Sequence, residues 1–299
     1  MAEVAKLLDD PQNVLAYTKS LLRNSDKIIL FTESRNDDFL YEELLEDENI
    51  TIISLRGKPK CKECAELCHN NGVELAASFT DNDFDMFFPK EKYNHIYTDY
   101  YDLEAYSIFS KKWVRIIREV LSLDRLKKKF SIDDYEEFRD KLIDVCLPVG
   151  ILMYLVKLNS YSKIEFKTYA FCRKCKIPKT LDNSLQLVLT RLKNLNPGSI
   201  NAAMEAKLLE EGNRVLTSLS TKSPKHNFIS STMMSKAIIS LAKTHSLFKS
   251  TKGPDGEKIE VLLNYLSMKA QFRSHVDEHN FHKSSMYKNL KTLLKKHKL

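Results

Sequence analysis

The stretch VELAASFTDNDFD, residues 73–85, joins a short apolar run to a series of carboxylates. Residues 73–80 predict a buried β-strand, because the run is short and apolar and follows Gly72, a residue typical of helix ends. Asp81 and Asp83 come directly after this strand, and Asp85 follows them. Binding groups in parallel α/β sheets gather just beyond the carboxyl ends of the strands. The stretch therefore predicts a strand that carries a binding or catalytic site at its end.

Short apolar runs alternate with amphipathic segments over the first third of the chain. Strands are also predicted at 27–34, 50–55 and 95–98, and helices at 4–23, 37–48 and 60–72. This alternation favours an α/β domain with a largely parallel sheet. From about residue 103 the periodicity becomes helical, with helices predicted at 103–124, 132–158, 183–195, 199–218, 229–247, 257–273 and 283–298. The predicted fold is α/β, with a parallel-sheet domain at 1–110 followed by a mainly α-helical domain at 111–299.

The composition fits a folded two-domain protein of 299 residues with a net charge of +7. The front part is acidic and the back part is basic, which favours a metal site in the first and a polyanion partner for the second. The first 25 residues carry no secretory signal, and the apolar run at 145–156 is too short to span a bilayer. We therefore expect a cytoplasmic protein with reduced cysteines and no membrane partner.

Carboxylates follow three of the four predicted strands. They are Glu33 and Asp37 after the first strand, Asp81 and Asp83 after the third, and Asp99, Asp102 and Glu104 after the fourth. Carboxylates packed without a counter-charge repel one another, and a divalent cation such as Mg²⁺ or Mn²⁺ relieves that repulsion. A calcium loop starting at Asp81 is excluded, because Met86 and Lys92 stand where it needs Gly and Glu. A solvated acidic turn remains the alternative.

Two segments resemble the motifs of TOPRIM domains. In LFTESRNDDFLY, residues 30–41, a strand leads into Glu33, and TDNDFD, residues 80–85, is similar to the Asp-x-Asp motif of those domains. With HIYTDYYDLEAY, residues 95–106, they resemble a TOPRIM-like family of unknown function whose members include AriB-type effector nucleases of the PARIS anti-phage system. The chain departs from the TOPRIM pattern at Ser34, where Gly usually follows the glutamate. A serine can close this turn through local hydrogen bonds.

The resemblance implies a toxic antiviral effector that hydrolyses phosphodiester bonds with Mg²⁺ or Mn²⁺. RNA, and tRNA in particular, is the implied substrate, although the residues themselves do not distinguish RNA from DNA. An ABC-type ATPase sensor is the implied restraining partner, and the implied released form is a homodimer. The implied catalytic residues are Glu33 and Asp37, and the implied metal ligands are Glu33, Asp81, Asp83, Asp99 and Glu104.

Two other functions stay open at the level of sequence. One is a non-catalytic interaction module, whose carboxylates bind a basic partner or a regulatory metal. The other is a nucleotidyl-transfer or DNA-processing enzyme, because TOPRIM domains serve those reactions too. The chain has no Walker A motif and only seven glycines, so nothing further supports that reading.

Basic residues of the predicted helical domain form a candidate surface for nucleic acid. The segments KKWVRIIR, 111–118, and DRLKKKF, 124–130, combine cations with aromatic side chains such as Trp113. The candidate residues are Lys111, Lys112, Arg115, Lys127, Lys128 and Lys129. Any one segment alone is better explained as a solvated helix face, but the occurrence of several in one half of the chain favours a surface for nucleic acid or an acidic partner.

Two Cys-x-x-Cys pairs, Cys61/Cys64 and Cys172/Cys175, carry a second metal hypothesis. Together they could form a four-cysteine zinc site. The wide separation of the pairs and the predicted helix around the first pair favour ordinary thiols instead.

Overall fold

The computed structural model describes residues 8–297 except 24, 26, 46–48, 167–183, 220–224, 253–257 and 261–262. The chain forms two compact units. The first unit comprises residues 1–99 and 278–299, and the second comprises residues 100–277. The predicted division at residue 110 is therefore corrected in two ways. The first unit ends earlier, and the C-terminal helices belong to it rather than to the helical domain.

The first unit is built on a parallel sheet of four strands, in the order β2-β1-β3-β4. The strands are β1 Ile28–Thr32, β2 Ile50–Ser54, β3 Ala76–Thr80 and β4 His95–Tyr97. All residues of the central strands β1 and β3 are buried, as expected for a parallel sheet covered on both faces. The prediction of an α/β fold with a parallel sheet is confirmed.

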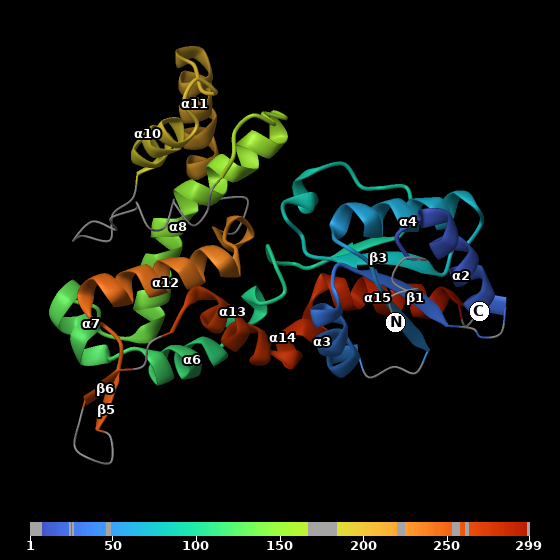
Figure 1. Cartoon of the computed structure of the whole chain (residues 1–299), viewed down its shortest axis with the longest axis horizontal. Coiled ribbons are helices and arrows are strands. Elements are labelled where there is room, and N and C mark those ends of the chain that lie inside the picture. The colour runs from blue at the N-terminus through green and yellow to red at the C-terminus, as the bar shows by residue number, and fades with distance from the viewer. Residues whose placement is uncertain are drawn as a thin grey trace. The chain divides into compact units, whose positions relative to one another are not determined.

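Helices cover both faces of this sheet (Figure 1). Its helices are α2 Pro11–Arg23, α3 Arg35–Leu45, α4 Lys58–Asn70, α14 Glu278–Lys283 and α15 Ser285–His297. The helix α4 packs against β1 and β3, and α2 packs on α4. The helix α3 packs against β1 and β2, and the ring of Tyr41 on α3 meets Phe79 of β3 edge-on at 4.6 Å. The helix α15 packs against β4.

The second unit is mainly helical, as predicted. Its helices are α5 Ala105–Ile108, α6 Lys112–Val120, α7 Leu123–Phe130, α8 Tyr135–Leu158, α10 Leu185–Leu195, α11 Ala202–Leu219, η2 Lys225–Phe228, α12 Ser231–His245 and α13 Tyr265–Ser274. The predicted helix 103–124 is wrong as a single element. The backbone is extended at Leu121, and the side chain of Ser122 then caps α7, so the chain starts a new helix there.

A small hairpin in the second unit was not predicted. It pairs β5 Ser250–Lys252 with β6 Lys258–Glu260 in antiparallel fashion, and β6 lies where the predicted helix 257–273 begins. Three-residue strands are too short to show a period in the sequence, which explains the error.

The core of the second unit surrounds α8 and Trp113. The indole N–H of Trp113 donates to the carbonyl of Tyr135 over 2.6 Å, and its ring stacks on Phe272 at 5.9 Å. At Gly150 the helix passes so close to Phe228 that a Cβ would lie 1.8 Å from the Phe228 carbonyl oxygen. Across the described part of the chain, no helix is long and apolar enough to cross a membrane.

Candidate functional site

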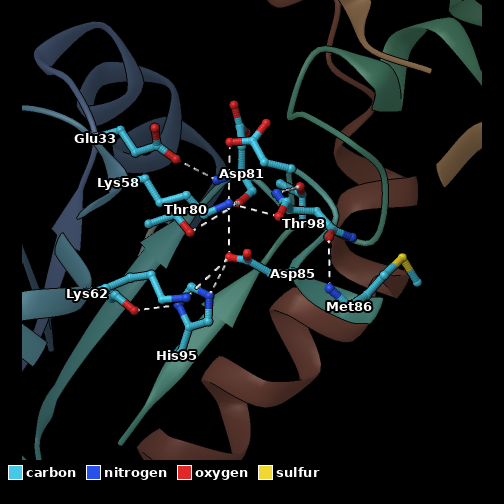
Figure 2. Close-up of polar contacts among 12 residues, drawn as sticks. Glu33, Lys58, Lys62, Thr80, Asp81, Asp85, Met86, His95 and Thr98 are labelled. Carbon is cyan, nitrogen blue, oxygen red and sulfur yellow. Dashed lines mark hydrogen bonds and ion pairs between the residues drawn. The ribbon is translucent and has the colours of Figure 1, made fainter. Parts of the chain in front are cut away.

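Three loops meet at the carboxyl edge of the four-stranded sheet (Figure 2). Glu33 follows β1, Lys58 begins α4 after β2, and Asp81 follows β3. The main-chain N–H of Asp81 donates to Oε1 of Glu33 over 3.0 Å, which ties the β1 and β3 loops together. Gly57, at a φ of 90°, turns the chain from β2 into α4, and its N–H donates to the carbonyl of Glu33 over 3.0 Å. The structure thus brings Glu33 and Asp81 to one place.

Lys58 supplies a positive charge in the middle of the acidic turn. Its side chain is 12% exposed, and its ammonium group donates to the carbonyl oxygens of Asp81 and Asn82. The same Nζ lies 3.4 Å from Oδ2 of Asp83 and 3.0 Å from Oδ2 of Asp85. Sequence reasoning missed this lysine, because it treated the carboxylates as lacking a counter-charge. The sequence signal that could have revealed Lys58 was its position just after the predicted strand 50–55, at the same edge of the sheet.

The turn after β3 holds two non-glycine residues in a left-handed conformation. The φ angles of Asp83 and Phe84 are 44° and 76°, and the ring of Phe84 is buried. The N–H of buried Asn82 donates to Oγ1 of Thr98 over 2.9 Å, and its Oδ1 accepts from the N–H of Met86 over 3.1 Å. Such conformations persist only where the surroundings fix them. This framework therefore sets the path of the chain that carries Asp81 and Asp83.

The carboxylate of Asp85 contacts several basic side chains. It lies 3.7 Å from Nζ of Lys62 and 3.0 Å from Nε2 of His95, whose Nδ1 is 2.6 Å from Oγ of Ser78. Burial would raise the pKa of Asp85, but the hydrogen bond with His95 and the charges of Lys58 and Lys62 outweigh it and hold that pKa far below its usual value. The Ser–His–Asp order is not a nucleophilic triad, because Ser78 is completely buried in β3.

Glu33 is a half-buried carboxyl group at the edge of the sheet. Burial raises its pKa, and the hydrogen bond from the Asp81 N–H only partly opposes that effect. Asp37 lies in the first turn of α3 and accepts a hydrogen bond from Oγ of Ser34 over 2.9 Å. Ser34 thus closes the turn through a local hydrogen bond. Asp37 takes part in shaping the loop that carries Glu33.

Two of the predicted metal ligands have other partners. Asp99 caps α15 by accepting hydrogen bonds from the N–H groups of Ser285 and Met286, over 2.8 and 3.1 Å. Glu104 belongs to the second unit, where it is 2% exposed and lies 3.6 Å from both Lys269 and Arg273. Both carboxylates are therefore neutralised by cations or by a helix N-terminus.

Asp102 is buried beside Glu104 in the second unit. Its Oδ2 accepts from the N–H of Ser231 over 2.7 Å and from Oγ of the same serine over 2.9 Å. Burial and the neighbouring Glu104 raise the pKa of Asp102 to about 7. Asp102 and Glu104 thus connect the start of α5 with α12 and α13. The sequence analysis had instead placed these two carboxylates at the edge of the sheet.

The candidate nucleic-acid residues all lie exposed on the second unit. Lys111, Lys112 and Arg115 are at α6, while Lys127, Lys128 and Lys129 are in the last turn of α7. Arg115 and Lys127 pair with Glu119 and Asp133 at 3.7 Å each, which are contacts of low energy at such exposure. The structure thus leaves these cations accessible.

The first cysteine pair lies in the core. Cys61, Cys64 and Cys68 are buried thiols on the sheet-facing side of α4, and burial raises the pKa of Cys64 to about 12 and that of Cys68 to about 11. These thiols therefore stay protonated at neutral pH. Cys172 and Cys175 lie outside the described residues, so the zinc hypothesis stays a hypothesis.

The carboxylate oxygens at the sheet edge are donors of the kind that a divalent cation prefers. Within the residues that the structure describes, no group of three or more His, Cys, Asp or Glu side chains is arranged to hold a metal ion. Mg²⁺ commonly takes only one or two protein carboxylates and completes its shell with water and phosphate oxygens. Asp81 and Asp83 lie on one turn and can supply two carboxylates, with Glu33 beside them, so the donor chemistry fits Mg²⁺ or Mn²⁺.

Comparison of the chain with protein-family models, with curated proteins and with solved structures found no match in any of the three.

Proposed function

We propose that this protein is a Mg²⁺- or Mn²⁺-dependent nuclease with a TOPRIM-like catalytic domain. The observation that carries the proposal is the meeting of Glu33, the Asp81–Asp83 turn and Lys58 at the carboxyl edge of a parallel sheet. Acidic oxygens for a cation and an ammonium group for a phosphate oxygen then stand side by side. The resemblance of segments 30–41 and 80–85 to TOPRIM motifs supports the same reaction.

In this proposal each side chain has a defined task. Glu33, with its raised pKa, accepts the proton of the attacking water, and the Asp81 N–H orients its carboxylate. Asp81 and Asp83 would hold the cation beside Glu33, and the cation would supply positive charge for the phosphate oxygens and lower the pKa of a bound water. Lys58 adds positive charge beside the scissile phosphate, and Asp85 keeps its ammonium in place.

A cavity beside Glu33 supports an anionic substrate. It has a volume of about 420 Å³, and its charged lining residues are Arg35 and Arg56 together with Glu33 and Asp9. Arg35 and Arg56 can contact the phosphates that flank the scissile bond, because guanidinium groups bind phosphate through two parallel hydrogen bonds. The pairing of Arg56 with Asp9 at 3.5 Å is exposed and therefore easily exchanged.

The biological setting is proposed from the resemblance. RNA, with tRNA foremost, is the proposed substrate, and the exposed cations of α6 and α7 would hold its backbone. The protein would act in the cytoplasm as an antiviral effector, restrained by an ABC-type ATPase partner and dimeric after release.

One observation favours a second candidate function. Lys58 already neutralises part of the acidic turn, so the turn does not require a metal in order to fold. The edge could then serve as a non-catalytic docking site for a basic partner. If the edge is a non-catalytic docking site, we expect the purified protein to cleave no nucleic acid.

The substitution Glu33→Gln tests the proposal. We expect it to lower Mg²⁺-dependent cleavage of RNA by at least about a hundredfold, since removing a general base typically costs that much. Glu43→Gln, on the exposed side of α3, is the matched control and should cleave as the wild type does. Cleavage of labelled RNA and DNA would be measured beside thermal melting. Wild-type rates in Glu33→Gln would overturn the catalytic assignment, and an inactive wild type would favour the docking module.

A further inference from the structure

The second unit contains a cavity that none of the roles described above uses. Its volume is about 480 Å³, within the usual range for small-ligand sites. Tyr100, Phe109 and His226 form one wall, and Arg139 and Lys225 lie at its charged side. The cavity thus combines flat rings with cations.

The aromatic wall is an ordered cluster of three half-buried rings. Tyr100 and Phe109 stack with centroids 5.2 Å apart and an interplanar angle of 25°. The ring of His226 meets Tyr100 edge-on at 4.8 Å and lies 5.3 Å from Phe109. Rings already fixed by one another lose little freedom when a further ring stacks on them. Such a cluster is suited to a nucleobase, because every base has a flat π-face.

The charged side of the cavity carries two ion pairs that a ligand can open. Nε of Arg139 lies 3.2 Å from Oδ1 of Asp140, and Nζ of Lys225 lies 2.7 Å from Oδ1 of Asp144. Both carboxylates and Lys225 are more than half exposed, so water screens these pairs and they hold their partners weakly. The cations can turn to a phosphate, and the carboxylates can then accept hydrogen bonds from sugar hydroxyls.

We propose that this cavity binds a ribonucleotide. The base lies against Tyr100, Phe109 and His226, and the phosphate lies on Arg139 and Lys225. The ribose hydroxyls donate to the carboxylates of Asp140 and Asp144, which favours ribose over deoxyribose. The nucleotide is either free or part of an RNA strand, since both present the same chemistry. The site is independent of the chemistry proposed for Glu33, because it uses residues of the second unit alone.

Binding of the full chain to mononucleotides tests this proposal. Adenosine, guanosine, cytidine and uridine monophosphates, the corresponding deoxynucleotides and a short single-stranded RNA would be titrated by calorimetry in EDTA, so that no cleavage occurs. We expect at least one ribonucleotide to bind, and its deoxy form to bind at least fivefold more weakly. Competition by RNA would identify a site for the strand, and its absence a site for the free nucleotide.

Substitutions separate this cavity from general attraction of anions. Arg139→Gln and Phe109→Leu should each weaken binding at least tenfold, the second because leucine keeps apolar volume but loses the ring. Arg214→Gln is the matched control, because Arg214 also pairs with a carboxylate, at 2.9 Å, on the exposed face of α11. Glu33→Gln should bind like the wild type even if it cleaves nothing. No nucleotide binding by the wild type, or unchanged binding in Arg139→Gln, would overturn the proposal.

Discussion

The ammonium group of Lys58 is shared among two carbonyl oxygens and two carboxylates of a single turn. This ammonium group does what we expected of a metal ion, because it offsets the repulsion between the carboxylates of Asp83 and Asp85. A divalent cation bound at Asp81 and Asp83 would therefore compete with Lys58 for oxygen atoms. In the proposed nuclease the turn would have two sources of positive charge, Lys58 and the bound cation.

Replacing Lys58 with methionine should expose this competition. Lys58→Met leaves Asp83 and Asp85 partly uncompensated, so the free energy of unfolding should fall by about 1–3 kcal/mol. Adding Mg²⁺ should then stabilise the variant more than it stabilises the wild type. Urea unfolding with and without Mg²⁺ would measure both effects, with the exposed Lys90→Met as the control. An identical Mg²⁺ effect in the variant and the wild type would argue against a metal at this turn.

The elements of the second unit are joined by a buried acid pair. Asp102 and Glu104, at the start of α5, face Ser231 at the N-terminus of α12 and Lys269 and Arg273 on α13. Burial penalises the ionised form of Asp102 and raises its pKa, so this carboxyl group makes stability depend on pH. The helix α12 depends on Asp102 for the hydrogen bond to its first residue.

Stability of the second unit should therefore fall as the pH rises from about 4 to about 7. The pKa of Asp102 is about 7 in the folded state and near its usual acidic value when unfolded, so the folded state binds more protons across that window. The slope from this group is at most about 1.4 kcal/mol per pH unit. Asp102→Asn, which keeps the acceptor for Ser231, should flatten it. Unfolding by urea at several pH values would measure the slope, and an unchanged slope would exclude Asp102 as its source.

Helices and strands were easier to predict from the sequence than the contacts that their side chains make. The apolar runs predicted β1 and β3 well because strands that are buried on both faces are continuously apolar, whereas the edge strands β2 and β4 are only partly buried. The position of Lys58 could not be read in the same way, since it depends on the angle at which α4 leaves the sheet at Gly57. Glu104 was misplaced for a related reason: its distance from β4 along the chain is short, yet the chain crosses into the second unit at residue 100.

At the scale of the whole molecule, the first unit is made of two separate pieces of chain. The helix α15 returns to pack on β4 and buries Met286, Leu290 and Leu294. The segment 278–299 also brings six lysines and one acidic residue to a unit that is otherwise acidic. A division into an acidic front domain and a basic back domain therefore overstates the charge difference between the two units.

A core substitution on α15 should destabilise the first unit. Leu290→Ala removes a completely buried side chain and should cost about 2–5 kcal/mol. Hydrogen exchange would then quicken in the strands β3 and β4, although the substitution lies far from them in sequence. Lys288→Ala, on the exposed side of the same helix, is the control and should change little. Exchange that quickens only within α15 would mean that the helix is not part of this unit's core.

The bond between Asp99 and the first residues of α15 has a consequence for the order of synthesis. A ribosome translates Glu33 and the Asp81–Asp85 turn early, but it must complete the whole second unit before α15 can emerge. Until then β4 lacks the helix that covers it, and the carboxyl edge stands in an unfinished nascent domain. Chains that terminate prematurely within the second unit would carry every acidic residue of the site and still lack the mature fold around it.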